Sequence, residues 1–132
     1  MSLHTGFAFA DEEMNAMYEA YQKQGNRYFV AEKNHQLMGG IGFGALKGAD
    51  TSVCELRKMY LVKQARGLGL GDELLRLVQE EAKKEYTTMY LETVSSMSQA
   101  IILYQRHGFE FLSAPLGDTG HYSCNTWMVK KL

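Results

Sequence analysis

A glycine-rich turn at Gln64–Gly71 constrains this chain more than any other feature of its sequence. The turn follows an apolar segment, Thr51–Val62, and opens Gly67–Glu85, where apolar residues recur at helical spacing. The first N–H groups of a helix have no partner inside the helix, and glycines let a ligand approach them closely. The helix dipole adds partial positive charge there. The turn therefore predicts an anion site at a helix start, with Arg66 rather than Lys63 as the nearby full charge.

Two other nucleotide-binding patterns, and a turn that binds nothing, are the alternatives. A P-loop needs Lys followed by Ser or Thr after the last glycine, but Asp72 and Glu73 stand there, which argues against a nucleoside triphosphatase. A dinucleotide-binding fold places its glycines in the first strand-to-helix turn, with an acidic residue about 20 positions later. Glu92 lies at about that distance, but three predicted strands precede the turn. The order of elements therefore makes this fold the weaker alternative.

Periodicity and turn residues predict a single α/β (α+β) domain over residues 1–132 with a mixed sheet. The expected helices are Asp11–Gln24, Gly67–Glu85 and Met97–His107. The expected strands are Arg27–Glu32, Gln36–Leu46, Thr51–Val62, Thr87–Val94, Phe109–Ser113 and Ser123–Val129. The first two strands are expected to form an antiparallel hairpin. Glycines at positions 39, 40, 42 and 44 predict a bulge in the second strand or a close approach by a ligand or by other backbone, with crowded packing as an equal alternative.

Charge and composition argue against several other kinds of protein. The chain has 14 Lys and Arg against 15 Asp and Glu, so it offers no broad cationic surface to nucleic acid. Cys54 and Cys124 lack the spacing of metal ligands, and we interpret them as reduced structural thiols. The sequence contains no run of about 18 apolar residues. We therefore expect a soluble cytoplasmic protein without a metal ion, a nucleic-acid partner or a membrane span.

A second motif follows the glycine-rich turn, and the two together are typical of a known family. Ala100, Leu103, Tyr104, Gly108 and Phe109 match the pattern Ala-x-x-Leu-Tyr-x-x-x-Gly-Phe, and Gln64–Gly69 matches Arg/Gln-x-x-Gly-x-Gly/Ala. On these motifs the chain resembles, over most of its length, the GNAT superfamily of acetyl-CoA-dependent N-acetyltransferases. The resemblance implies a mixed, mostly antiparallel twisted sheet with helices on both faces and a splayed central pair of strands.

The same resemblance implies acetyl-CoA as cosubstrate and assigns residues to its binding. Backbone N–H groups from Arg66 to Gly71 would hold the pyrophosphate, and the strand end Met59–Val62, splayed by a bulge, would pair with the pantetheine arm. A backbone N–H at Met59 or Leu61 would polarise the thioester carbonyl, and the two positions are alternatives. The cofactor-binding residues expected in this way are Met59, Tyr60, Leu61, Val62, Gln64, Arg66, Gly67, Leu68, Gly69, Leu70, Gly71 and Tyr104.

An acid and a base complete the chemistry that the resemblance implies. An amine with a pKa near 10 is mostly protonated at neutral pH, so a base must take its proton before it attacks. Glu55, on the central strand, is the first candidate, with an ion pair to Arg57 or Lys58 as its alternative role. Glu92 is the second candidate, with a solvated strand face as its alternative. Tyr104 occupies the family's general-acid position, where it would protonate the departing thiolate; its alternative is core packing.

The resemblance implies that a primary amine of a small molecule or peptide attacks acetyl-CoA directly in a ternary complex. A non-catalytic acyl-CoA-binding module is the alternative function. His121 lies in a polar turn near the expected acceptor pocket, and Tyr18, Tyr21 and Tyr28 are candidates for its walls. Only about ten residues precede the helix at Asp11–Gln24, so we expect a shorter N-terminus than in the family. The sheet edge that this would expose leads to the hypothesis of a homodimer.

Overall fold

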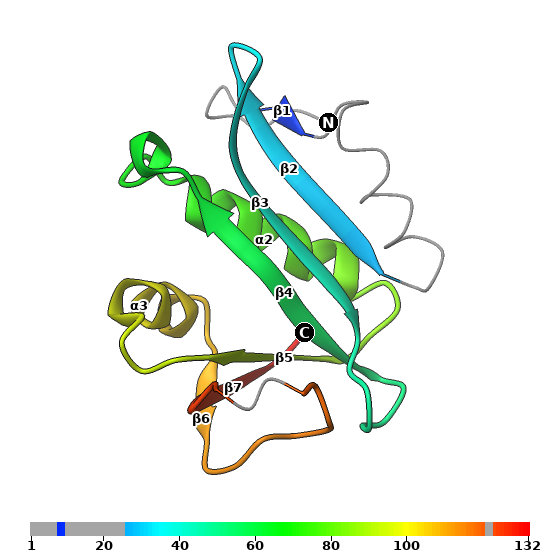
Figure 1. Cartoon of the computed structure of the whole chain (residues 1–132). Coiled ribbons are helices and arrows are strands. Elements are labelled where there is room, and N and C mark those ends of the chain that lie inside the picture. Colours follow the sequence, from blue (N-terminus) through cyan, green and yellow to red (C-terminus); the bar gives the residue numbers. More distant parts are fainter. Residues whose placement is uncertain (1–7, 10–25, 121–122) are drawn as a thin grey trace.

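The computed structural model describes residues 8–9, 26–120 and 123–132, which form one sheet and two α-helices (Figure 1). Along the chain the elements are β1 (Ala8–Phe9), β2 (Arg27–Lys33), β3 (Gln36–Ala45), β4 (Val53–Leu61), the 3₁₀ helix η2 (Lys63–Ala65), α2 (Leu70–Ala82), β5 (Thr88–Thr93), α3 (Ser98–Arg106), β6 (Glu110–Leu112) and β7 (Thr126–Lys131). The strands of this sheet lie in the order β1-β2-β3-β4-β5-β7-β6. The expected α/β (α+β) class is confirmed. The predicted helix Asp11–Gln24 lies outside the described residues, as do Tyr18, Tyr21 and His121.

The N-terminal half of the sheet is antiparallel. β2 and β3 form the predicted hairpin, whose turn holds Asn34 and His35 at φ values of 53° and 64°. β4 runs antiparallel to β3 on its other side. β3 therefore lies in the interior of the sheet, with a strand on each side.

β4 and β5 are parallel neighbours over a short distance only. Their paired residues are Val53 with Thr88, Cys54 with Met89, and Glu55 with Tyr90. β4 then continues to Leu61, and among the described residues no strand pairs with it on this side, whereas β5 pairs along its whole length with β7. Figure 1 shows the two strands diverging from their shared end. The predicted splayed central pair is confirmed, and it leaves one side of β4 open.

β4 carries a bulge opposite the glycine-rich part of β3. The pairing of the two strands shifts between Gly40 and Gly42, so Ile41 faces two residues of β4, Lys58 and Met59. Lys58 has a left-handed backbone with φ 51°, a region that non-glycine residues rarely occupy. The glycines of β3 predicted a bulge in β3, and its pairing with β2 does shift between Ala31 and Glu32, which leaves Met38 as the extra residue. The bulge opposite Gly40–Gly42 is a second one, and its extra residue belongs to β4.

Both described α-helices contribute to one hydrophobic core on one face of the sheet. The buried residues of α2 are Leu70, Gly71, Leu74, Leu75, Val78 and Ala82. Tyr104 of α3 belongs to the same cluster of buried side chains. The sequence predicted that α2 would start at Gly67, but it starts at Leu70. Gly67 and Gly69 have φ values of 77° and 82°, which are incompatible with a right-handed helix.

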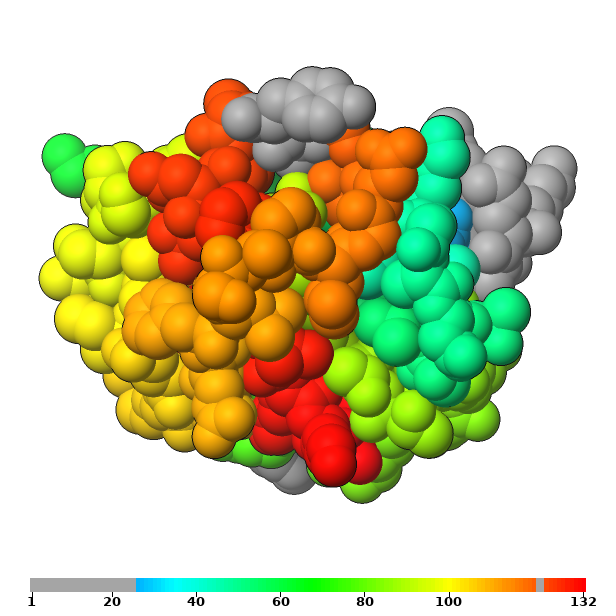
Figure 2. Space-filling view, turned by 90° about the horizontal axis from the view of Figure 1, so that it is seen from below, coloured from blue at the N-terminus to red at the C-terminus, as the bar shows by residue number. Residues whose placement is uncertain are grey.

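The segment between β6 and β7 lies against the base of the sheet. The Asp118 N–H donates to Lys47 O at 2.7 Å, and the Leu116 N–H donates to the Tyr90 hydroxyl at 3.2 Å. Figure 2 shows this segment, in orange, beside the turn that follows β3. Because Tyr90 pairs with Glu55, the segment borders the point where β4 and β5 separate.

Candidate active site

The glycine-rich turn presents N–H donors at the start of α2. A Cβ added at Gly67 or Gly69 would meet no atom within 4 Å, so their positive φ values, not crowding, require glycine. The Glu73 N–H donates to Gly69 O at 3.1 Å, and the N–H groups before it in α2 have no acceptor inside the helix. Arg66 is exposed, with its Nη2 3.4 Å from Leu61 O. Helix-start donors beside a guanidinium suit an anion.

Gly71 has a different role from the two glycines before it. A Cβ there would lie 3.1 Å from Leu103 Cδ2 and 3.5 Å from Leu61 Cδ1, so its small size lets α2 begin close to α3 and β4. The next residue of α3, Tyr104, is 8% exposed, and its hydroxyl donates to Met59 Sδ at 3.9 Å. The structure therefore brings the glycine turn, the open side of β4 and Tyr104 together.

Tyr104 is both a core residue and a neighbour of the open strand. Its ring packs on Phe109 with the ring centroids 5.9 Å apart. Burial raises the pKa of Tyr104 above its ordinary value. The phenol therefore keeps its proton at neutral pH and can donate it to an anion that forms beside β4.

The end of β4 directs backbone groups to its open side. In an antiparallel pair, successive residues point their backbone groups alternately toward the partner strand and away from it. The Val62 N–H donates to Met38 O of β3 at 2.8 Å, so Leu61 points the other way. Val62 O also accepts from the Ala65 N–H at 3.0 Å. Met59–Leu61 therefore suits pairing with an extended ligand better than the predicted Val62 does. The exposed residues of the predicted cofactor set at this end include Tyr60, Gln64 and Leu68.

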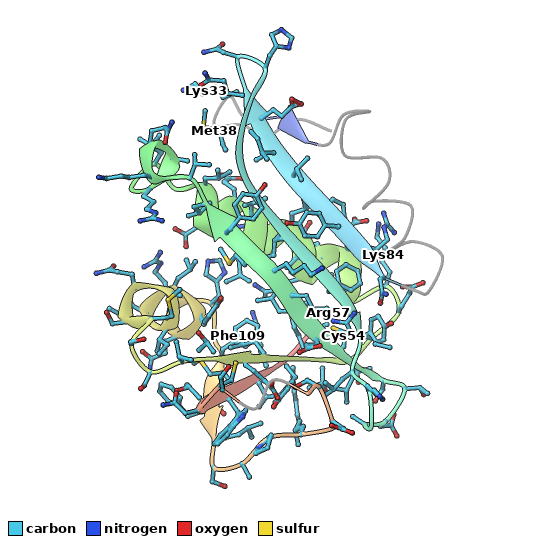
Figure 3. The ribbon with its side chains drawn as sticks, viewed as in Figure 1. Lys33, Met38, Cys54, Arg57, Lys84 and Phe109 are labelled. Atoms are coloured by element: carbon cyan, nitrogen blue, oxygen red, sulfur yellow. The ribbon has the colours of Figure 1, made fainter. Side chains whose placement is uncertain are left out.

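Glu55 lies where β4 and β5 separate. It is 4% exposed, and Arg57 Nε donates to its Oε1 at 2.9 Å. Arg57 Nη2 also donates to Ala45 O at 2.6 Å, which holds the guanidinium at the lower end of β4 (Figure 3). The ion pair that was the alternative role of Glu55 is therefore present, and it orients the carboxylate at the base of the gap.

Glu92 is held near this position by two hydroxyl groups. The Tyr90 hydroxyl donates to its Oε2 and the Thr119 hydroxyl to its Oε1, each at 2.6 Å. Burial, followed by the hydrogen bond to Glu92, raises the pKa of Tyr90 well above its ordinary range, and the charge of Glu55 acts in the same direction. Glu92 is therefore half-buried rather than on a solvated strand face, and it ties β5 to the segment before β7.

One charged cluster was not predicted from the sequence. Asp72, in the first turn of α2, accepts hydrogen bonds from Arg106 Nε at 3.1 Å and Nη2 at 2.9 Å. His107 Nε2 lies 2.7 Å from the same carboxylate. The hydrogen bonds from Arg106 are the main cause that lowers the pKa of Asp72. The cluster fixes the start of α2 to the end of α3. An acidic first turn and a basic last turn are its only signals in the sequence.

The cysteines show no sign of catalysis or metal binding in the part of the chain that the structure describes. Cys54 is buried, and burial raises its pKa to about 12. Cys124 is half-buried, and burial raises its pKa too. Among the described residues no group of three His, Cys, Asp or Glu side chains is placed to hold a metal ion. The same residues include no helix that is long and apolar enough to cross a membrane.

Comparison with protein families and known sequences agrees with this geometry. Residues 16–111 match the acetyltransferase (GNAT) domain family. The chain is 36% identical over 128 residues to YjgM of Escherichia coli K12, an uncharacterized N-acetyltransferase. The alignment covers 96% of this chain and 77% of that protein. It is 34% identical over 94 residues to YsnE of Bacillus subtilis, also an uncharacterized N-acetyltransferase, covering 69% and 62% of the two chains.

Two solved structures show the same fold. An acetyltransferase of the GNAT family from Staphylococcus aureus Mu50 superposes with a TM-score of 0.78 at 24% identity, covering 92% of this chain and 80% of that one. The acetyltransferase yncA of Salmonella typhimurium, solved with its cofactor acetyl-CoA, superposes with a TM-score of 0.72 at 25% identity, covering 92% and 74%. Since the family match spans well over half of the chain, the protein belongs to the GNAT acetyltransferase family and is an acyltransferase.

Proposed function

We propose that this enzyme transfers an acetyl group from acetyl-CoA to a primary amine of a small molecule or peptide, by direct attack in a ternary complex. The observation that carries the proposal is the open side of β4, which lies between the start of α2 and Tyr104. An extended ligand can add to such a strand through main-chain hydrogen bonds. The related yncA was solved with acetyl-CoA, which supports this choice of acyl donor.

The residues at the turn fit the phosphates of this donor. The open space around Gly67 and Gly69 lets a diphosphate reach the N–H groups at the start of α2, and Arg66 adds a full positive charge. The pantetheine arm then lies along Met59–Leu61, with its thioester end near Tyr104. This arrangement uses the cofactor residues expected from the sequence, except that Val62 contributes little through its engaged backbone.

The reaction needs one proton removed and one supplied. Glu55, directly or through water, takes the proton of the attacking amine, and Glu92 is the second candidate for this role. The amine nitrogen forms a bond to the thioester carbon, the carbon–sulfur bond breaks, and Tyr104 gives its proton to the departing thiolate. A backbone N–H of β4 stabilises the carbonyl oxygen during attack, an effect worth about 3 to 4 kcal/mol in other enzymes.

Tyr104→Phe tests the proposal, with Tyr86→Phe as a matched control in the same core cluster. CoA release is followed with a thiol reagent over a panel of amines, and acetyl-CoA binding is measured by titration calorimetry. We expect Y104F to keep its affinity for acetyl-CoA while kcat falls about 100-fold or more, since general acid catalysis contributes about that much. Y86F should behave like the wild type.

Two results would replace the proposal. Binding of acetyl-CoA without CoA release on any amine would favour the non-catalytic acyl-CoA-binding module. Binding of NAD without binding of CoA would favour the dinucleotide-binding alternative. Unchanged turnover in Y104F would remove Tyr104 as the acid but keep the transfer reaction.

A further inference from the structure

Tyr28 of β2 is a buried tyrosine that the reaction scheme above does not use. It is 3% exposed and crosses β3 toward β4. A Cβ at Gly40 would lie 2.7 Å from the Tyr28 hydroxyl oxygen, and one at Gly42 would lie 2.6 Å from its Cδ2. Both distances are shorter than side-chain contacts allow. Gly40 and Gly42 therefore make room for this ring, which is the crowded packing that their number left open rather than a close approach by a ligand or by backbone.

The hydroxyl of Tyr28 reaches the bulge of β4. It donates to Lys58 O at 3.2 Å, and Lys58 is the residue with the left-handed backbone. An unfavourable backbone conformation persists only where its surroundings hold it. The hydrogen bond from Tyr28 is one such contact, and it orients the peptide unit that joins Lys58 to Met59.

That peptide unit carries the N–H of Met59. A trans peptide is planar, so its C=O and N–H point in opposite directions. The Lys58 carbonyl points to Tyr28, which lies over β3, and the Met59 N–H therefore points away from β3. The alternation of backbone groups counted back from Val62 gives the same direction. The Met59 N–H thus faces the open side of β4, where the Tyr104 hydroxyl lies 3.9 Å from Met59 Sδ.

We infer that Tyr28 is a positioning residue for acyl transfer: through Lys58 it holds the Met59 N–H where it donates to the thioester carbonyl. The inference rests on the proposed function, and it selects Met59 over Leu61 as the donor to the carbonyl oxygen. Outright removal of such a donor lowers kcat about 100- to 1,000-fold in other enzymes. Loss of the Tyr28 hydroxyl leaves the N–H in place but less constrained, so the expected loss is smaller.

Tyr28→Phe is compared with Tyr86→Phe, which removes a hydroxyl from the core on the other face of the sheet. We expect Y28F to lower kcat about tenfold or more, within the limit set by losing the donor, while the acetyl-CoA Kd changes less than about twofold. Y86F should leave both unchanged. In nitrogen-15 NMR spectra, exchanging CoA for acetyl-CoA should shift the Met59 amide proton downfield in the wild type and shift it less in Y28F.

Gly40→Ala tests the same contact without removing the hydroxyl, and it carries the test if Y28F does not fold. Its Cβ would lie 2.7 Å from the Tyr28 hydroxyl oxygen and displace it, and it would also lie 2.8 Å from Tyr60 Cε1, so G40A should lower kcat at least as much as Y28F does. The double variant should lose little more than G40A alone, because both changes act on the same Tyr28 hydroxyl. If the wild type is active, two results overturn the inference and leave the proposed function standing. One is an unchanged kcat in Y28F, and the other is a downfield shift at Leu61 instead of Met59. A wild type that neither binds acetyl-CoA nor releases CoA overturns both.

Discussion

Gly69→Ala tests whether the left-handed backbone of the glycine turn, rather than its tight packing, is needed for stability and for CoA binding. Gly69 has φ 82°, and a Cβ there would meet no atom within 4 Å, so the substitution strains the backbone without a clash. Holding an alanine in the left-handed region costs about 1–2 kcal/mol. If the turn relaxes instead, the N–H groups at the start of α2 are redirected. We expect the free energy of unfolding to fall by about 1–2 kcal/mol. The Kd for CoA should rise about tenfold, which corresponds to about 1.4 kcal/mol of lost binding.

The matched control is Gly71→Ala, two residues further along. Gly71 has no positive φ, and alanine gains up to about 1 kcal/mol over glycine inside a helix. Against this gain stands a contact of 3.1 Å from the new Cβ to Leu103 Cδ2, the end of a side chain that can shift. We expect a stability within about 1 kcal/mol of the wild type. Urea unfolding followed by circular dichroism and calorimetric titration with CoA measure both quantities. Wild-type affinity of G69A for CoA, or a loss of stability in G71A as large as that in G69A, would contradict this role of the backbone conformation.

Three further predictions concern charged and thiol groups. Asp72→Asn should lower the unfolding free energy by about 1 kcal/mol, because the amide replaces two charged acceptor oxygens with one neutral one and leaves one donor of Arg106 without its acceptor, and the melting temperature should fall by about 4 °C. The pKa of Asp72 is lowered in the folded state, so its contribution is present above the unfolded value of about 3.9 and is lost as pH falls below it. The stability gap between wild type and D72N should therefore shrink in urea titrations below about pH 4, and a constant gap would contradict this. Glu55→Gln should lower kcat about 100-fold with unchanged acetyl-CoA affinity, whereas a wild-type rate would leave the ion pair as its only role. Iodoacetamide at pH 8 should alkylate Cys124 before Cys54, as followed by mass spectrometry, because Cys54 is buried with its pKa raised to about 12; the reverse order would show that the core opens readily.

Local patterns in the sequence predicted the elements of the fold and the place of the turn. The period of the apolar residues after Gly71 predicted α2, since one helix face must cover the sheet. Polar residues between two segments rich in β-branched and aromatic residues predicted the hairpin whose turn holds Asn34 and His35. The two motifs predicted that the turn and Tyr104 belong to one site, and the structure places both beside β4. In each case the signal lies within a few neighbouring residues.

Contacts between distant parts of the chain were not predictable in this way. The hydrogen bonds of Asp72 join residues 34 positions apart, and that of Tyr28 joins residues 30 positions apart. In neither pair does the local sequence around one residue indicate which distant residue it will contact. The glycines of β3 indicated that space was needed, but not that a ring from β2 fills it, and the bulge of β4 was expected only from the family resemblance. The start of α2 was misplaced because apolar periodicity does not reveal the backbone φ at Gly67 and Gly69.

The divergence of β4 from β5 has a consequence for how rigid the molecule is before it binds a ligand. Only three residue pairs join the two halves of the described sheet at this seam. Leu61 O accepts a hydrogen bond from Arg66 on this side, and the other main-chain groups on the open side of β4 must be hydrated, which places water in the middle of a sheet rather than at its margin. An acyl donor that lies there as a strand exchanges this water for cross-strand hydrogen bonds and links the two halves. Under the proposed function, the enzyme is a sheet that its own substrate completes.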